Sequence, residues 1–491
     1  MSKEKRLHPI AAVSNAFKLI KESFLPLIAL LVFGGDRHGP SALLDIFLVP
    51  SLVAGLIVYG ILNWYRFTYR IEDREIRIES GVLFKKKRYI RFERIHSIDV
   101  SEGILQRLFG LVKVKIETAG NKGGRAEAEL TAISKAEAVE IDRLFFQVKY
   151  AASDPVLDAD HMSSETQHEH SKSEPGTNIF SLSFRKLLLM AATSGGVGVV
   201  FSGTVAFISQ FDEIIPFDAV FKGFAQFAKS SVLTISLMLF IGLVLAYFAA
   251  AVGVLLRYAH FTVWKKDEDI IITRGLLERR QLTIPIKKIQ GIRITENLMR
   301  QPLGYATVYV EYAGGSVLDK ESANIMLFPI IKKETLADLV QQTTGDYKAD
   351  SELNPVPARS FSRYIWRKGI LALPLAAVCS ILYWPWGLIT FVSLLPLAAL
   401  WGYFCYKDAG WLLNGSQLQL RYRFLSRQTV VLRKNRIQSM DFESNWFQQK
   451  RQLSSLSATV ATGAAPRTGE VKDVDLADSL KIKAWFSNGR R

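Results

Sequence analysis

The chain has 491 residues, of which 49% are hydrophobic and 22% are charged, and 62 Lys and Arg against 46 Asp and Glu give it a formal net charge of +16. This length is too great for one hydrophobic core and predicts about three domains. The charge favours an acidic partner, either nucleic acid or an anionic membrane surface, and the grouping of apolar residues into long blocks favours the membrane. The two cysteines, Cys379 and Cys405, lie in or beside apolar runs, which argues against disulfides and metal-binding thiolates.

The apolar blocks come in pairs. Residues 24–33 and 42–63 flank a polar turn, and the second run is long enough to cross a hydrocarbon core of about 30 Å. The first run is short, so its helix must extend back to about residue 19, tilt little or insert only partly. A basic segment precedes it and no small-residue cleavage site follows, so we predict an anchored hairpin rather than a removable signal peptide. Two further pairs of runs span 187–207 with 231–256 and 370–383 with 386–406.

Lys and Arg at the ends of these runs predict the orientation of the chain. Only Arg37, Lys222 and Lys229 lie on one side, whereas the other side carries most of the basic residues near the helix ends. We therefore expect a multi-pass protein of the cell membrane with about six spans, both termini and all soluble domains facing the cytoplasm.

Each predicted hairpin precedes one copy of an internal repeat. Residues 75–117 align without a gap with 269–311 and, more weakly, with 417–459. Apolar and polar residues alternate within each copy, a period that predicts strands with one buried face in an antiparallel sheet or barrel. A repeat of this length is a domain rather than a solenoid unit.

Each copy also ends in a predicted helix. In the first copy, Ser134 is a candidate N-cap and Glu137 completes a capping box at the start of a helix over 134–146. Residues 332–341 and 478–486 take the same place in the later copies. Strands closed by one C-terminal helix describe a small barrel plugged at one end.

The repeat resembles the second class of bacterial pleckstrin-homology-like (PH-like) domains. The resemblance rests on a basic residue followed by Ile in the segments 94–98, 288–292 and 436–440, together with Gly110 and Gly304, and it covers nearly the entire chain. It implies three PH-like domains and a smaller homologous PH-like membrane protein as partner. It also implies a heteromeric assembly with a role in envelope stress or in resistance to membrane-active antimicrobial peptides.

The predicted architecture is an α/β membrane protein with three transmembrane helical hairpins, each followed by a small antiparallel PH-like β-barrel closed by a C-terminal helix. The first linker lacks periodicity and is expected to be flexible. The hairpins occupy 1–65, 180–257 and 361–406, the PH-like domains 66–148, 258–343 and 407–487, and the linkers 149–179 and 344–360.

The third copy departs from the pattern of the first two at both glycine turns. Arg423 stands where the first copy has Gly81, and Gln452 stands where it has Gly110. Because glycine supplies a positive φ or a close backbone approach, the third copy must form these turns in another way. If one copy has become purely structural, we expect it to be the last.

No catalytic constellation is visible, and we predict neither an enzyme nor a bound cofactor or metal. The glycine-rich run at 195–203 lies inside an apolar block, where small residues favour close helix packing over a dinucleotide loop. His161, His168 and His170 lie in the first linker, without thiolates or fixed geometry. Asp45 is an acid inside a predicted span, either functional or hydrated at the outer mouth, and its shallow position favours hydration.

Lys and Arg are concentrated on one strand and turn of the first two copies, in domains tethered directly under the membrane. Each cation near an anionic leaflet gains on the order of 1 kcal/mol, so this surface can contact acidic headgroups or an acidic partner. A solvated positive face that only orients the protein explains the cluster equally well. The candidate binding residues are Lys85, Lys86, Lys87, Arg88, Arg91, Arg94, Arg279, Arg280, Lys287 and Lys288.

These observations favour a non-enzymatic membrane scaffold whose domains bind each other, a homologous subunit or anionic membrane lipids, with no nucleic acid partner. The alternative is a transporter or exporter component for antimicrobial peptides. Against that alternative stand the absence of a nucleotide-binding motif and the scarcity of charged residues within the predicted spans.

Overall fold

The computed structural model describes residues 4–17, 19–20, 23, 41–72, 74–82, 84–118, 128–151, 176–194, 232–312, 325–350, 352–382, 387–462 and 466–488. The predicted span at 24–33, the glycine-rich run at 195–203 and the histidines of the first linker lie outside the described residues.

Each copy of the repeat forms two groups of three antiparallel strands, joined by a single turn of 3-10 helix. Buried Ile76 and Ile78 alternate with more exposed residues, as the period of two predicts. The first copy contains β2 (Thr68–Glu72), β3 (Glu75–Ser80), β4 (Lys86–Arg91), β5 (Ile95–Glu102), β6 (Leu111–Thr118) and β7 (Ala128–Ser134). The second contains β9 (Thr262–Lys266), β10 (Asp269–Arg274), β11 (Arg279–Pro285), β12 (Ile289–Glu296), β13 (Tyr305–Tyr312) and β14 (Ile325–Lys332). The third contains β16 (Gly410–Asn414), β17 (Gln417–Arg423), β18 (Arg427–Arg433), β19 (Ile437–Glu443), β20 (Leu453–Val460) and β21 (Arg467–Asp475).

A helix follows the last strand of each copy, at the positions that the sequence predicts. The capping box at the first of these helices is confirmed: the Glu137 amide donates to Ser134 Oγ at 3.2 Å, and the Ser134 amide donates to Glu137 Oε2 at 3.2 Å. Short helices also follow β5 and β19, namely α3 (Ile104–Leu108) and α12 (Trp446–Gln449). The closing helices are α4 (Lys135–Ala151), α9 (Lys333–Thr344) and α13 (Leu476–Ser487).

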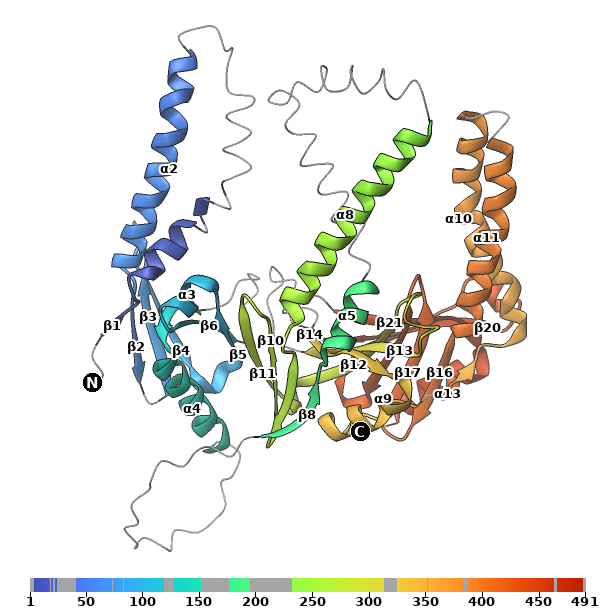
Figure 1. Ribbon diagram of the computed structural model, residues 1–491. Coiled ribbons are helices and arrows are strands. Elements are labelled where there is room, and N and C mark those ends of the chain that lie inside the picture. The colour runs from blue at the N-terminus through green and yellow to red at the C-terminus, as the bar shows by residue number, and fades with distance from the viewer. Residues whose placement is uncertain are drawn as a thin grey trace, which may run out of the picture.

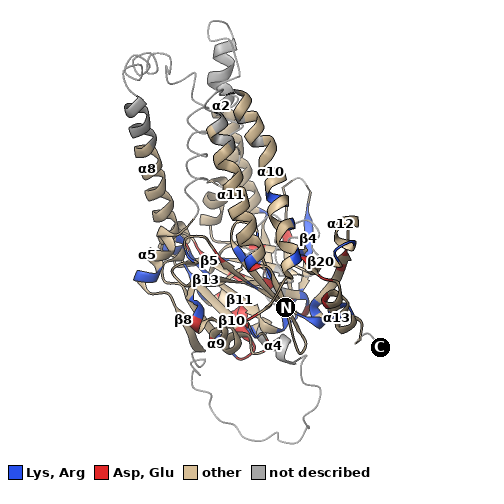
Figure 2. Ribbon diagram, turned by 90° about the vertical axis from the view of Figure 1, so that its right-hand side faces the viewer, with Lys and Arg blue, Asp and Glu red and all other residues tan. Residues whose placement is uncertain are grey.

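Long apolar helices rise from one side of the strand-containing part of the molecule (Figure 1). The turned view agrees, with these helices again above the sheets (Figure 2). Helices α10 and α11 lie against each other as an antiparallel hairpin. The regions predicted to form the hairpins of the first two copies are described only in part. The long helices are α2 (Ser41–Tyr65), α8 (Val232–Tyr258), α10 (Phe361–Leu382) and α11 (Gly387–Asp408), and the shorter α5 (Phe184–Ala192) lies beside the sheets.

Within the described residues, one helical stretch, Phe240–Tyr258 of α8, is long and apolar enough to cross a membrane by length and composition. The stretch Pro50–Tyr65 of α2 is apolar but shorter. The number of spans predicted from the sequence is therefore larger than the number of helices in the described part that meet this test.

The strands within the described residues form four open sheets, and two of these sheets combine strands from neighbouring copies. The first sheet has the order β1-β2-β3-β4, where β1 is Lys5–Arg6. The second has the order β7-β6-β5-β11-β10-β9-β8, and the third β14-β13-β12-β18-β17-β16-β15. The fourth has the order β19-β20-β21. Strands β8 (Thr177–Ser181) and β15 (Asn354–Pro355) precede the second and third hairpins.

Among the strands that the structure describes, the predicted closed barrels are therefore not formed. In the second copy, β11 pairs with β5 of the first copy, and β12 pairs with β18 of the third copy. The two strand groups of one copy thus belong to different sheets. The pattern of alternating residues was correctly assigned to strands, but it does not identify which strand lies beside a given edge.

Each shared sheet is covered by a different core on each face. Ile98 of β5 belongs to the core of the first copy and lies opposite Thr283 of β11. The next residue, Ile284, points to the other face and belongs to the core of the second copy. Because successive side chains of a strand point to opposite faces, neighbouring cores lie on opposite sides of the sheet that joins them. The junction is therefore part of both cores.

A short strand before each predicted hairpin pairs with the first strand after it. β1, β8 and β15 precede the three predicted hairpins, and they pair with β2, β9 and β16, which follow them. The second linker is also packed against the sheets: the buried Tyr347 side chain donates to the Ile289 carbonyl at 3.1 Å. Burial raises the pKa of Tyr347 to about 12. This segment is part of the folded structure and not a free connector.

The third copy forms its glycine-less turns in two different ways. Gly81 and Gly275 have φ of 110° and 106°, whereas Arg423 is an ordinary residue at the end of β17, directly opposite Arg427. Gln452, in contrast, keeps the left-handed conformation of the glycines that it replaces, with φ of 51°. One turn was rebuilt, and the other retains a conformation that side chains seldom adopt.

Candidate functional site

The candidate basic residues of the first copy lie on a strand at the edge of a sheet. β4 is the last strand of the first sheet, and Lys86, Lys87, Arg88 and Arg91 are all exposed on it. Lys85, just before the strand, and Lys87 both form ion pairs with Glu79, at 2.7 and 3.1 Å. Their hydrogen bonds lower the pKa of that carboxyl group, although its partial desolvation opposes this.

Arg94 is also exposed, and its counterparts in the later copies bind the preceding copy. Lys288 Nζ donates to the carbonyl oxygen of Ile95 at 3.2 Å, and Arg436 Nη2 donates to the Lys287 carbonyl at 2.6 Å. Position 94 of the repeat is therefore used at both junctions inside the chain.

The remaining basic residues of the second copy lie at or near its junction with the first copy. In the strand register, Arg279 is opposite Glu102 and Arg280 is opposite Ser101. Arg280 also pairs with Glu278 at 2.9 Å, and Lys287 pairs with Glu268 at 2.6 Å. The structure thus separates the predicted set, because β4 is an edge strand of its sheet whereas β11 is paired with β5 of the first copy, although Arg279 remains exposed.

The second junction repeats the strand register of the first and contains side-chain ion pairs. Arg427 of β18 lies opposite Glu296 of β12, and the two side chains form two hydrogen bonds of 2.9 and 2.5 Å. The Arg427 guanidinium also contacts Asp408 at 3.2 Å, and Arg423 pairs with the same carboxylate. Burial would lower the pKa of Arg427, but these acids raise it overall. The ion pairs therefore connect the helix end, the second copy and the third copy.

One buried polar residue of each copy bonds, directly or through Asp473, to the first helical segment of its predicted hairpin. Gln106 of α3 donates to Ser14 Oγ at 3.1 Å, within the helical residues 10–17. Arg300, at the same repeat position, donates to Thr193 Oγ1 at 2.8 Å and to the Met190 carbonyl at 3.3 Å. Its cation lies at the C-terminal end of α5, where the helix dipole favours positive charge, and burial lowers its pKa.

Gln448 holds the same position in the third copy and donates to Asp473 Oδ1 at 2.9 Å. The buried Asp473 carboxylate also pairs with Arg363 and Arg367 of α10, at 2.7 and 2.5 Å. Two cations and one amide thus satisfy one buried anion. The lower end of the α10–α11 hairpin is fixed to β21 through this residue.

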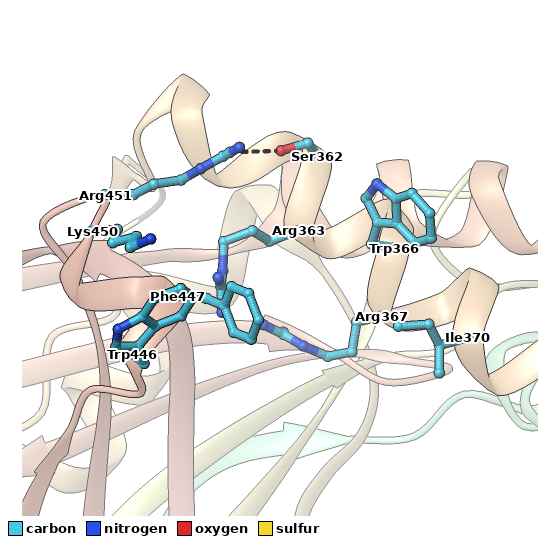
Figure 3. A pocket seen from close by; sticks show the side chains of 9 residues that line it. All are labelled: Ser362, Arg363, Trp366, Arg367, Ile370, Trp446, Phe447, Lys450 and Arg451. Atoms are coloured by element: carbon cyan, nitrogen blue, oxygen red, sulfur yellow. Dashed lines mark hydrogen bonds between the residues drawn. The ribbon is translucent and has the colours of Figure 1, made fainter.

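A cavity of about 690 Å³ opens at the lower end of α10, between that helix and α12. Figure 3 shows the side chains that line it, with the hydrogen bond of 2.9 Å from Arg451 Nη1 to Ser362 Oγ drawn as a dashed line. Lys450 Nζ lies 3.6 Å from the centre of the Trp446 ring. The lining residues are Ser362, Arg363, Trp366, Arg367, Ile370, Trp446, Phe447, Lys450 and Arg451.

This cavity combines cations with exposed aromatic rings. Trp366, Trp446 and Phe447 each expose 60–65% of their surface, and the four cations lie among them. Such a combination suits a ligand that has an anionic head and an apolar body. Among the described residues, no group of three or more His, Cys, Asp or Glu could hold a metal ion.

Arg300 and Asp473 were not singled out from the sequence. A usable signal exists for the first, because the ungapped repeat places Gln106, Arg300 and Gln448 at one position, which is polar in all copies. Asp473 has no such signal. Its two arginine partners are about 110 residues away along the chain, and only the fold brings them together.

Comparison with known proteins gives three matches along the chain to one family. Residues 24–148, 217–344 and 369–490 each match the family described as bacterial PH domain. A relative from Bacillus subtilis (strain 168), the transmembrane protein YdbT, is 37% identical over 496 residues, and the alignment covers 99% of each chain. The resemblance expected from the repeat is confirmed.

Proposed function

Because the chain belongs to the bacterial PH domain family, we propose that it is a non-enzymatic integral membrane scaffold whose three PH-like units bind partners at the membrane surface. The name of the B. subtilis relative, a transmembrane protein, supports the membrane part of this proposal. The three helical hairpins predicted from the sequence would anchor the units.

The observation that carries the proposal is the exposed apolar surface of the long helices. Phe240, Leu245 and Phe248 on α8 expose 61–65% of their surface, and Ile381 and Val392 on α10 and α11 expose 79% and 68%. Soluble proteins rarely expose large contiguous apolar patches, and contact with lipid would remove the free-energy cost of leaving these side chains in water.

Basic residues at the lower ends of the same helices support a cytoplasmic orientation. Arg257 lies in the last turn of α8 and Lys407 in the last turn of α11. Arg363 and Arg367 lie near the start of α10. Lys and Arg are retained on the cytoplasmic side of spans, so the sheets would lie inside the cell.

Cysteine labelling tests the insertion and orientation together. In a chain with Cys379 and Cys405 replaced by Ala, Lys481→Cys on the exposed surface of α13 should resist a membrane-impermeant maleimide in intact cells and react after permeabilisation. Trp384→Cys, between α10 and α11, should react in intact cells. Labelling of Lys481→Cys from outside would refute the orientation, and extraction of the protein by alkaline carbonate would refute the integral anchoring.

We further propose that the cavity below α10 binds the headgroup of an anionic lipid. Reconstituted protein should retain phosphatidylglycerol in native mass spectrometry, and Lys450→Gln with Arg451→Gln should reduce retention roughly thirtyfold, because each of the two cations near anionic lipid contributes on the order of 1 kcal/mol. Lys481→Gln with Lys483→Gln removes the same charge from exposed positions of α13 and serves as the control. Equal retention in both double variants would contradict the site.

The resemblance suggests a heteromeric complex with a smaller PH-like membrane protein and a protective role in envelope stress or against membrane-active antimicrobial peptides. A scaffold should protect cells without direct use of the proton gradient. Cells that express the protein should therefore keep their relative advantage over a deletion strain when the gradient is collapsed. Loss of that advantage alone would favour the exporter component instead.

A further inference from the structure

The three copies form a continuous series of sheets, which we call the array. The strands that end this array, β4 and β19, correspond to the strands that pair where neighbouring copies meet. At each internal junction, a strand of the β4 type from the later copy, β11 or β18, pairs with a strand of the β5 type from the preceding copy, β5 or β12. β4 itself ends the first sheet, and β19, the β5-type strand of the third copy, ends the last sheet. The array therefore begins with one half of a junction and ends with the other half.

Both internal junctions use the same register. Position 85 of the first copy corresponds to 279 and 427, and position 102 corresponds to 296 and 444. The pairs Arg279–Glu102 and Arg427–Glu296 therefore both join position 85 of the later copy to position 102 of the preceding copy. Two independent junctions with one register define how a third junction of the same kind would be aligned.

This register brings opposite charges together at the free ends. Antiparallel pairing of β4 with β19 from another molecule would place Lys86 opposite Glu443 and Arg88 opposite Asp441. Lys86, Asp441 and Glu443 are exposed in the monomer. Opposite charges directly across two strands stabilise their pairing, whereas like charges destabilise it.

An exposed aromatic side chain occupies the position that is buried at both internal junctions. Thr283 and Val431 correspond to Tyr89, and they are only 4% and 1% exposed, whereas Tyr89 is 59% exposed. Val431 packs in the core of the second copy although it belongs to the third. In the shared register, Tyr89 would cover Met440, which borders the core of the third copy.

Lysines on an edge strand often serve to prevent pairing with other chains. That role would explain β4 alone, but it gives no reason for the acidic residues at the matching positions of β19. The similarity of both ends to the internal junctions, together with this charge pattern, favours a specific partner over simple protection.

We propose that β4 of one molecule pairs with β19 of a second copy, so that copies of this chain associate head to tail through a junction like the two internal ones. This inference deepens the proposed scaffold function by naming the partner, and it rests on that function. Such a contact joins different surfaces of two identical chains, so it forms a closed ring or an extended row according to the rotation at each junction. The membrane anchors would keep either assembly within the plane of the bilayer.

Charge reversal in the full-length protein, reconstituted in lipid vesicles, tests the proposal. Dual-colour fluorescence should detect association of the wild-type chain. Lys86→Glu with Arg88→Glu, or Asp441→Lys with Glu443→Lys, should weaken it roughly tenfold or more, since each creates two like-charge pairs. A mixture of the two variants, or one chain carrying all four changes, should recover association because opposite charges again face each other.

A crosslink tests the register. Tyr89→Cys and Met440→Cys, introduced into separate chains that lack both native cysteines, should form an intermolecular disulfide, and Tyr89→Cys with Asp478→Cys should not. Monomers at every protein-to-lipid ratio, or failure of the mixed variants to recover, would overturn the inference. Exclusive capture of a different PH-like chain at β4 would overturn the choice of a second copy. A monomer that retains the predicted labelling pattern would leave the scaffold proposal intact.

Discussion

All three copies share the same pattern of buried apolar residues. The third copy differs from the first two at the two turns where those copies have glycine. Gly275 leaves room for the Glu278 carbonyl, since a Cβ there would lie 2.0 Å from that oxygen. At the matching position, Arg423 adopts the strand conformation and pairs with Asp408 at the end of α11. The difference teaches that the third copy has an ionic attachment to its helical hairpin where the first two copies have a tight glycine turn.

Among the substitutions that test this difference between the copies, Gly275→Ala should reduce the stability of the protein most. The added Cβ overlaps a backbone oxygen at a φ of 106°, and the combined overlap and strain should cost roughly 3 kcal/mol. A lower apparent melting temperature in detergent would report this cost. Gly253→Ala in α8 meets nothing within 4 Å and should melt like the wild type. A Gly275→Ala protein of unchanged stability would mean that the turn is not specific to glycine.

Exchanging glycine and glutamine at the second turn should change stability less, and in opposite directions in the second and third copies. Gln452→Gly should stabilise the third copy by about 1 kcal/mol, and Gly304→Gln should destabilise the second by a similar amount, because a side chain in the left-handed region costs about that much. A Cβ at Gly304 meets nothing within 4 Å, so the conformation alone is tested. Changes of the same sign in both variants would contradict this explanation.

Substitutions at the start of the closing helices α4 and α9 should change stability least. The capping box distinguishes the first copy from the second, where Lys332 makes no side-chain cap. Partial burial raises the pKa of Glu137, but hydrogen bonds from Lys5 and the Ser134 amide outweigh this and lower it overall. The stabilisation is therefore present above the unfolded pKa of about 4.3 and is lost as the pH falls through the folded value.

Glu137→Gln should consequently reduce stability at pH 7 by less than about 1 kcal/mol, and its difference from the wild type should shrink at acidic pH. Melting curves between pH 7 and pH 3 would measure this convergence. A difference that stayed constant over the range would show that the charge of Glu137 contributes nothing. Asp338→Asn on α9, outside any such cap, provides the comparison.

Local patterns in the sequence predicted the strands, the closing helices and the capping box. The pairing between copies could not be predicted from alternation, because a residue buried against its own copy and one buried against a neighbour look alike. A weaker signal did exist. Val430, Val431 and Leu432 form a continuous apolar run, which is typical of a strand covered on both faces, whereas the matching positions of β4 carry Arg88 and Tyr89 before Ile90.

The candidate site was predictable only in part. The cations of β4 were identified from their density, but their separation from those of β11 depends on which edge has a neighbour. The cavity below α10 joins residues about 80 residues apart in the chain, so no local motif indicates it.

The end of α8 is bonded to the turn between β10 and β11, and this has a mechanical consequence. The Gly275 amide donates to the Ala259 carbonyl at 2.8 Å, and the Leu276 amide donates to the Leu256 carbonyl at 2.9 Å. The helix is thus clamped to a sheet whose seven strands come from two copies. The helix cannot change its angle to the sheet without breaking these two hydrogen bonds. A change in the tilt of α8 within the bilayer would therefore move the sheet, and through the shared sheet it would move the neighbouring copy.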